Sequence, residues 1–217
     1  KGKIMNIEQE KINQQKLVNM IRFVEERHFG QKRKSYDLDF TYHLYEIMLI
    51  LSNAGVTDKD ILMAGLGHDL IEDTDTTQDE IRKQFGDKVT NIILDCTDDR
   101  TTKKKDRKLH QIKIASQLDI NSRLVKLADK ISNLQSLLIA PPKKWDSQRL
   151  YGYILWSRKV VLELQENLIT DKNRQNPKIE MFNKLIKNYI EIDFNVELQY
   201  GLKVDTELFL EEYLNNL

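Results

Sequence analysis

The residues best suited to chemistry form one short segment, His68-Asp69-Leu70-Ile71-Glu72-Asp73-Thr74-Asp75. Its four carboxylates fall within residues 69–75 and directly follow an apolar run that predicts a buried helix over 61–71. Carboxylates crowded at the C-terminal end of a helix repel one another and the helix dipole, so burial would push protons onto some of them. A bound cation would remove this conflict and give His68 a use as a nitrogen ligand. A solvated acidic turn is the plainer alternative.

Two residues elsewhere in the chain are candidates to complete such a site. His43 lies at the edge of the apolar face of a predicted helix, where a core histidine with satisfied hydrogen bonds is the alternative. Asp129 lies in the middle of a predicted helix over 124–138, where Asp has poor propensity and a buried carboxylate needs a partner. Two imidazoles and two carboxylates without sulfur favour Mn²⁺ or a similar first-row ion over a closed structural zinc.

The elements that must position these residues are predicted to be helices. The first 140 residues contain no proline, and apolar residues recur at helical spacing along most of the chain, so we expect an all-α multi-helix bundle. Thr57-x-x-Asp60 and Thr77-x-x-Glu80 resemble capping boxes. One segment, 194–200, alternates apolar and polar residues with the period of a half-buried strand, so a short strand or hairpin is expected there as an alternative to helix.

Length, charge and cysteine content limit the class of protein. The 217 residues fit one domain, expected over 5–168, followed by a C-terminal helical appendage over 169–217. The chain has 34 basic and 34 acidic residues, so a nucleic-acid coat or polybasic membrane binder is not expected. A single cysteine, Cys96, excludes an internal disulfide framework and indicates a cytoplasmic protein. The apolar runs are far shorter than the roughly 20 residues that cross a bilayer.

The spacing of His43, His68-Asp69 and Asp129 resembles the H…HD…D signature of the HD phosphohydrolase superfamily. The longer run His-Asp-Leu-Ile-Glu-Asp-Thr at 68–74 is similar to the hydrolase domain of RelA/SpoT-type alarmone enzymes, above all to the small single-domain hydrolases of the metazoan type. Two positions depart from the pattern, because Leu44 stands where the family commonly has Pro and Gly67 where it has a larger apolar residue. Further matching segments are Phe85-Gly86, Thr97-Asp98-Asp99, residues 125–130, Asn133-Leu134, and Trp145 with Arg149.

This resemblance implies Mn²⁺-dependent hydrolysis of guanosine 3′,5′-bis(diphosphate) or its pentaphosphate form, giving GDP or GTP and pyrophosphate. It implies a set of metal ligands, a pair that activates water, and contacts to the nucleotide. The implied metal ligands are His43, His68, Asp69 and Asp129, and the implied pair that activates water is Glu72 and Asp73. The implied nucleotide contacts are Arg33, Lys34, Arg107, Asn133 and Arg149. The zero net charge would then conceal an acidic segment at 69–75 and basic segments at 31–34 and 100–108, although the basic segments could also be solvated loops.

Other functions stay open on the sequence. One alternative is removal of the 2′-phosphate of NADPH by a small hydrolase of the same type. Another is a generic HD-domain nucleotidase acting on deoxynucleotides, which would share the metal ligands without needing Glu72-Asp73. A non-catalytic HD regulatory module would be expected to have lost a ligand. Residues 169–217 could mediate self-association or cover the pocket, so an oligomer is possible, and no nucleic-acid or membrane partner is expected.

Overall fold

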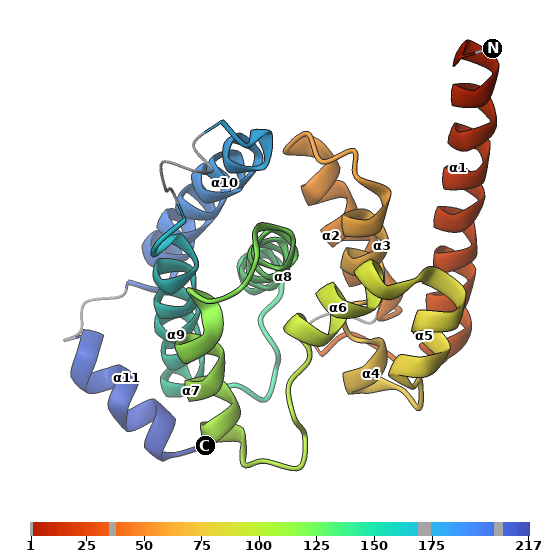
Figure 1. The fold of residues 1–217 in the computed structure, drawn as a ribbon. Helices are drawn as coiled ribbons and strands as arrows, with labels where there is room; N and C mark the ends of the chain where they lie inside the picture. The colour runs from red at the N-terminus through yellow and green to blue at the C-terminus, as the bar shows by residue number, and fades with distance from the viewer. Residues whose placement is uncertain (1, 35–37, 169–174, 202–205) are drawn as a thin grey trace.

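The computed structural model describes residues 2–34, 38–168, 175–201 and 206–217, which form helices joined by loops (Figure 1). Within these residues the extended backbone pairing is limited to an isolated antiparallel bridge between Lys32 and Asp39. The prediction of an all-α fold is therefore confirmed. The helices are α1 (Gly2–Arg27), α2 (Thr41–Asn53), α3 (Lys59–Gly67), α4 (Leu70–Asp73), α5 (Gln78–Phe85), α6 (Asp87–Cys96), α7 (Lys104–Ala115), α8 (Ile120–Ile139), α9 (Ser147–Gln165), α10 (Pro177–Tyr200) and α11 (Thr206–Asn215).

Helix α8 is the centre of the fold. Figure 1 shows it almost end-on, with α9 and α10 on one side and α2 and α3 on the other, and it packs against all four and against α6. The apolar residues of α3 that predicted a buried helix are fully enclosed, among them Ile61, Met63 and Leu66. Because both α3 and α8 lie inside this core, the polar side chains that they carry are held on rigid supports.

The expected strand at 194–200 is wrong, because this segment forms the last turns of α10. Phe194 and Leu198 lie one turn apart on its outer face, with exposed fractions of 59% and 66%, while Val196 is buried. In a helix, residues two positions apart point to opposite sides, so the alternating apolar residues divide between the outer face and the core, and the alternation alone was not decisive. The helix ends at Gly201, whose positive φ of 63° suits glycine.

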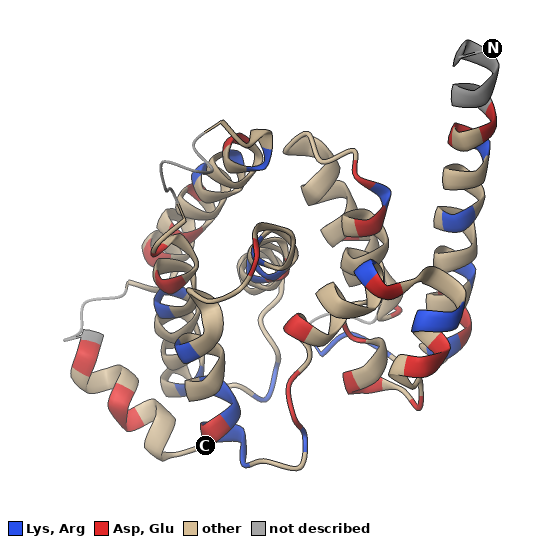
Figure 2. Cartoon of the chain, in the orientation of Figure 1, with Lys and Arg blue, Asp and Glu red and all other residues tan. Residues whose placement is uncertain are grey.

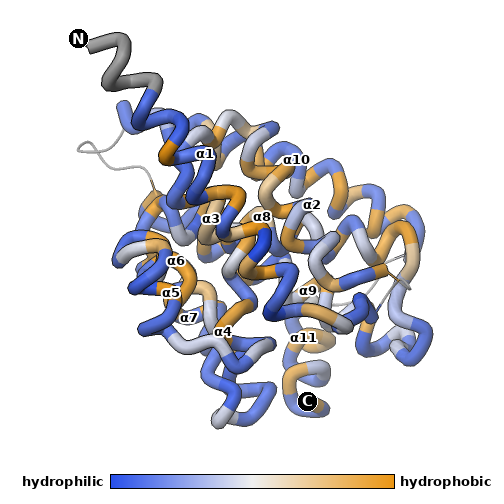
Figure 3. The backbone as a smooth tube through the Cα atoms, turned by 90° about the vertical axis from the view of Figure 1, so that its right-hand side faces the viewer, coloured by the Kyte–Doolittle hydropathy of each residue, from blue (hydrophilic) through white to orange (hydrophobic). Residues whose placement is uncertain are grey.

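The C-terminal helices pack onto the rest of the protein. Figure 3 shows α10 alternating between hydrophobic and hydrophilic turns, and its inner face places Phe182, Leu185 and Val196 in the same hydrophobic core as α3 and α8. Helix α11 packs on α7 and α9. The Tyr213 ring lies where a side chain at Gly152 would be, since an added Cβ there would be 2.0 Å from Tyr213 Cγ. Within the described residues, no helix is long and apolar enough to cross a membrane.

The two predicted capping boxes have different outcomes. Thr77 and Glu80 form a complete capping box at the start of α5, with both reciprocal hydrogen bonds present. At the start of α3 the N-cap is Asp58, whose carboxylate accepts from the backbone N–H of Asp60, so the box predicted from Thr57 is wrong by one residue. Asp58 also forms ion pairs with Lys88 and Lys178, which joins the start of α3 to α6 and α10.

Candidate active site

The acidic segment begins at a break in the chain between two helices. Helix α3 ends at Gly67, His68 is its C-cap, and the four-residue α4 starts after Asp69. The helix predicted over 61–71 is therefore interrupted, and Glu72 and Asp73 lie in the first turn of α4 instead of at the C-terminal end of a long helix. This corrects the expected conflict with the helix dipole, because carboxylates are favoured in the first turn of a helix.

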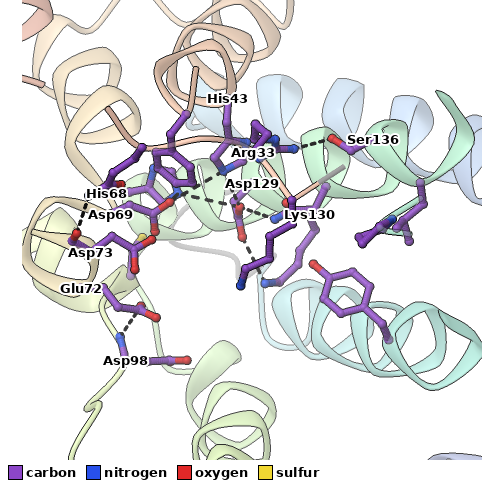
Figure 4. Close-up of a pocket in the computed structure, with 18 of the residues that line it drawn as sticks. Arg33, His43, His68, Asp69, Glu72, Asp73, Asp98, Asp129, Lys130 and Ser136 are labelled. Atoms are coloured by element: carbon purple, nitrogen blue, oxygen red, sulfur yellow. Dashed lines mark hydrogen bonds and ion pairs between the residues drawn. The ribbon is translucent and has the colours of Figure 1, made fainter. Parts of the chain in front are cut away.

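Four side chains from α2, the α3–α4 junction and α8 converge on one point (Figure 4). His43 Nε2 lies 3.3 Å from Asp129 Oδ1 and 3.9 Å from Asp69 Oδ2. His68 Nε2 lies 3.1 Å from Asp69 Oδ2 and 3.8 Å from Asp129 Oδ1. The ligand atoms of His43, His68 and Asp69 all lie within 4.8 Å of one another, so a single cation could contact them together.

Both imidazole rings are oriented with Nε2 toward this point. The Oγ of Ser132 donates to Glu46 Oε2 at 2.8 Å and lies 2.8 Å from His43 Nδ1, so the hydroxyl accepts the Nδ1 proton. His68 Nδ1 lies 2.9 Å from the carbonyl oxygen of Gly65, which can only accept. The Nε2 of His68 is buried and faces the carboxylate of Asp69 without a well-aligned hydrogen bond. Metal-binding histidines are usually held in this way through the other ring nitrogen, so the residues present fit a divalent ion.

The charges of the site are strongly coupled. Burial lowers the pKa of His43. Although burial acts in the same direction on His68, the carboxylates of Asp69 and Asp129 raise its pKa to about 9. Burial also opposes ionisation of Asp129, but Lys130 and His43 hold the pKa of this carboxyl well below its usual range. Without a cation the carboxylates therefore keep a proton on His68, and a bound divalent ion would take the place of that charge.

Glu72 and Asp73 lie next to the ligand cluster. The Oε2 of Glu72 accepts a hydrogen bond of 3.2 Å from the backbone N–H of Asp98, and Arg100 forms ion pairs with both Glu72 and Asp73. Burial, together with the charges of Asp69 and Asp98, raises the pKa of Glu72. A carboxylate with a raised pKa is a stronger base than an exposed glutamate and suits proton abstraction.

These groups form the acidic end of a cavity of about 680 Å³, which is in the range of small-molecule sites. Among the predicted nucleotide contacts, Arg33, Lys34 and Asn133 line this cavity. The amide of Asn133 donates to Asp129 Oδ1 at 2.6 Å, and the guanidinium of Arg33 donates to the hydroxyl of Ser136. Arg33 and Lys34, which precede α2, thus line the same cavity as Asn133 of α8.

Arg107 and Arg149 do not line the main cavity. Arg107 donates to the backbone oxygen of Thr102 at 2.9 Å. The Arg149 guanidinium lies 4.9 Å from the ring centre of Trp145, whose ring lines the main cavity. Arg149 itself lines a separate cavity of about 300 Å³ together with Lys104 and Tyr213. The basic segment that starts α7 thus lies beside the main cavity, and Figure 2 shows it following the acidic loop after α6.

Two buried lysines of the cavity were not assigned a role from the sequence. Lys126 and Lys130 are 4% and 3% exposed and line the cavity. Lys130 Nζ lies 3.1 Å from Asp129 Oδ2, and Lys126 donates to the backbone oxygen of Cys96. Their spacing of four residues on the most apolar part of α8 was the available signal, because a lysine on a buried helix face needs a polar neighbour. Further lining residues are Gln31, Asp98, Arg100, Gln111 and Tyr153.

Comparisons with known proteins agree with this geometry. The model of the HD-domain family matches residues 21–152. The chain is 35% identical over 152 residues to the guanosine-3′,5′-bis(diphosphate) 3′-pyrophosphohydrolase MESH1 of Drosophila melanogaster. The matched region covers 69% of this chain and 85% of the relative. It is 38% identical over 151 residues to the Homo sapiens protein of the same name, covering 69% and 84%. A solved structure of a metazoan orthologue of SpoT, described as hydrolysing ppGpp, superposes with a TM-score of 0.68 at 31% identity, covering 79% of this chain and 94% of that one.

Proposed function

The chain belongs to the HD-domain family, and we propose that it is a metal-dependent guanosine-3′,5′-bis(diphosphate) 3′-pyrophosphohydrolase. Water attacks the phosphorus bonded to O3′, the bond between that phosphorus and O3′ breaks, and pyrophosphate leaves from GDP or, for the pentaphosphate, from GTP. The observation that carries this proposal is the convergence of two imidazoles and two carboxylates beside Glu72 and Asp73. The relatives that carry this activity in their names support the choice of substrate.

The proposed ligands of the divalent metal are His43, His68, Asp69 and Asp129. We assign Mn²⁺ because the set mixes nitrogen and oxygen donors and contains no thiolate. When bound, the ion supplies Lewis-acid chemistry that polarises a phosphoryl oxygen and acidifies a water. The hydrogen bonds from His43 to Ser132 and from His68 to Gly65 keep the Nε2 lone pairs available for this ion.

Glu72 and Asp73 are the proposed general-base pair. Their carboxylates lie one turn of chain after His68 and Asp69, and the backbone N–H of Asp73 donates to Asp69 O at 2.8 Å, which ties the pair to a ligand. Glu72 takes the proton of the attacking water as the bond to phosphorus forms. Arg100 balances the negative charge of the pair.

The nucleotide is proposed to occupy the rest of the cavity. Arg33, Lys34 and Asn133 contact it from the cavity wall, and Lys126 and Lys130 add positive charge near the phosphates. Arg107 and Arg149 remain proposed contacts for 5′-phosphates that extend past the cavity. Burial and the neighbouring cations Arg149, Lys34 and Arg107 lower the pKa of Lys104, and a group of cations of this kind would attract a phosphate.

The catalytic unit is proposed to be residues 5–168, with 169–217 as a supporting helical segment. Among the described residues, the cavity is lined from Gln31 to Tyr153, so α10 and α11 contribute packing and no direct cavity contact. The burial of Phe182 and Leu185 against the core makes α10 a structural support for α8.

Turnover of guanosine 3′,5′-bis(diphosphate) and of NADPH, each with Mn²⁺ and with a chelator, tests the function. The expected result is chelator-sensitive release of pyrophosphate and GDP. Release of orthophosphate from NADPH with no turnover of the guanosine compound would replace the proposal with an NADPH 2′-phosphatase. Absence of turnover for both, with no bound divalent ion, would support a non-catalytic module.

A further inference from the structure

A buried histidine lies outside the ligand set, at the end of α1. His28 is 2% exposed, and its ring stacks on Phe40 with centroids 5.0 Å apart. Its Nδ1 lies 2.9 Å from Gln31 Oε1, and its Nε2 is buried without a hydrogen-bond partner. Burial lowers the pKa of His28, so the ring is neutral near pH 7. A neutral, fully buried imidazole with a single hydrogen bond is suited to orienting that one partner.

The partner, Gln31, joins His28 to the proposed base pair. Gln31 Nε2 donates to the backbone oxygen of Asp73 at 2.8 Å, across 42 positions of sequence. Because a carbonyl oxygen only accepts, the amide nitrogen must face Asp73, and the amide oxygen must then face His28. His28 Nδ1 therefore carries the ring proton. The backbone of Gln31 is fixed as well, since its N–H donates to His28 O and its carbonyl accepts from the N–H of Phe40.

Helix α4 needs such support because it has only four residues. Its carbonyl groups find few partners inside the helix, and the bond from Gln31 satisfies the carbonyl of Asp73. The Asp73 carboxylate is held by Arg100, whose side chain is 55% exposed. The hydrogen bonds from His28 to Gln31 and from Gln31 to Asp73 therefore connect the end of α1 to the backbone of α4 and restrict its movement.

We propose that His28 and Gln31 are positioning residues that fix the backbone of Asp73, and with it the Glu72-Asp73 pair, relative to the metal ligands. This inference rests on the proposed role of that pair in hydrolysis. A displacement of about 1 Å at a reacting group can cost on the order of 100-fold in rate, so a hydrogen-bond chain that ends on this backbone controls kcat.

Two substitutions at His28 separate positioning from packing. His28→Asn places an amide N–H close to the position of Nδ1 and loses the ring, whereas His28→Phe keeps the ring on Phe40 and loses the donor. We expect His28→Phe to lower kcat roughly 10- to 100-fold with KM and Mn²⁺ content nearly unchanged, and His28→Asn to keep most of the wild-type kcat. The reverse ranking would overturn the proposal and make His28 a packing residue. His110→Phe, at an exposed histidine of α7, is the matched control and should be unchanged.

Gln31→Met tests the second member of the chain, because Met has a similar length and makes neither hydrogen bond. We expect the same fall in kcat as for His28→Phe, and the His28→Phe/Gln31→Met double variant should be no slower than either single variant. Since Gln31 lines the cavity, a rise in KM with unchanged kcat would instead indicate direct contact with the substrate and would overturn the positioning role.

Nitrogen-15 NMR of the wild-type protein provides a readout that does not depend on turnover. The proposal requires a pyrrole-type Nδ1 and a pyridine-type Nε2 for His28, assigned by the loss of these signals in His28→Asn. A protonated Nε2 would contradict it. If the expected tautomer were observed but the wild-type protein did not hydrolyse the guanosine substrate, the proposed function would be wrong. The hydrogen bonds from His28 through Gln31 to Asp73 would then be confirmed as structural contacts, without a role in that reaction.

Discussion

The two ends of the main cavity are built differently. At the acidic end the side chains of His43 and His68 are 3% and 6% exposed, and each ring is fixed by a hydrogen bond on its far side. At the basic end Lys34 is exposed and Arg33 is half-buried, and Arg107 and Arg149 are engaged with Thr102 and Trp145 beside the cavity. Rigid, buried groups suit a reaction that needs fixed geometry, whereas exposed cations suit attraction of phosphates. Substitutions at the acidic end should therefore change kcat by orders of magnitude, and those at the basic end should change KM by smaller factors.

The largest effect is expected from removing a ligand at the acidic end. Asp129→Asn keeps the shape of the side chain but removes its charge, so Mn²⁺ should no longer be retained. Loss of a stabilisation of several kcal/mol corresponds to a fall in kcat of roughly 1,000-fold or more. Elemental analysis and steady-state kinetics measure the two quantities, with circular dichroism as the check on folding. A folded variant with full metal content and wild-type turnover would show that Asp129 is not a ligand.

The next effect separates the base pair from the metal ligands. Glu72→Gln with Asp73→Asn should lower kcat by roughly 100- to 10,000-fold, which is the usual contribution of a general base, while Mn²⁺ content stays at the wild-type level. Both quantities can be measured on the same preparation. If the double variant stays active, the assignment of the base is wrong; if it loses the metal, the pair belongs with the ligands.

The pH dependence of metal affinity sharpens the same comparison. Because the carboxylates raise the pKa of metal-free His68 to about 9 against burial, the ring is protonated at neutral pH and must release its proton when a metal binds. The affinity for Mn²⁺ should therefore rise about tenfold per pH unit as the pH approaches 9 and then level off. Titration calorimetry at several pH values, in buffers of different ionisation enthalpy, measures the affinity and the released proton. An affinity that does not change between pH 6 and pH 8 would contradict this protonation state.

The smallest effects are expected at the basic end. Arg33→Lys loses the planar guanidinium that lines the cavity, and KM should rise about tenfold with little change in kcat. Arg107→Lys should change KM less than Arg33→Lys, because Arg107 lies beside the cavity. Steady-state kinetics at two ionic strengths measures both variants, since salt screens exposed contacts more strongly than buried ones. A larger effect at Arg107 would place the phosphates outside the main cavity.

The ligand candidates could be found in the sequence because metal chemistry restricts both the residue types and their surroundings. A histidine and carboxylates next to an apolar run are unusual, and Asp129 in the middle of an apolar helix needed a partner. The helices followed from the spacing of apolar residues, and the cap at Thr77 followed from a pattern of four residues. These signals are local, so one sequence was sufficient to read them.

Other features depended on contacts that no local pattern encodes. The break between α3 and α4 decides where Glu72 and Asp73 lie, although the apolar pattern predicted a continuous helix to residue 71. A Cβ at Gly67 would lie 3.0 Å from Ile93 Cδ1, so the unusual glycine before His68 reflects packing against α6. Arg107 and Arg149 were grouped with the cavity residues because a local pattern does not show where a long side chain points. In the structure Arg107 donates to Thr102, and Arg149 lies over the ring of Trp145.

The sequence by itself determined an all-α protein and predicted two histidines and two aspartates as ligands of one cation, because periodicity and residue chemistry are carried by neighbouring positions. The tertiary structure decided which cations face the cavity, that α10 is a helix packed along α8, and that His28 reaches Asp73 through Gln31. These relations join positions tens of residues apart, and the distances between such positions are set by the packing of the whole core.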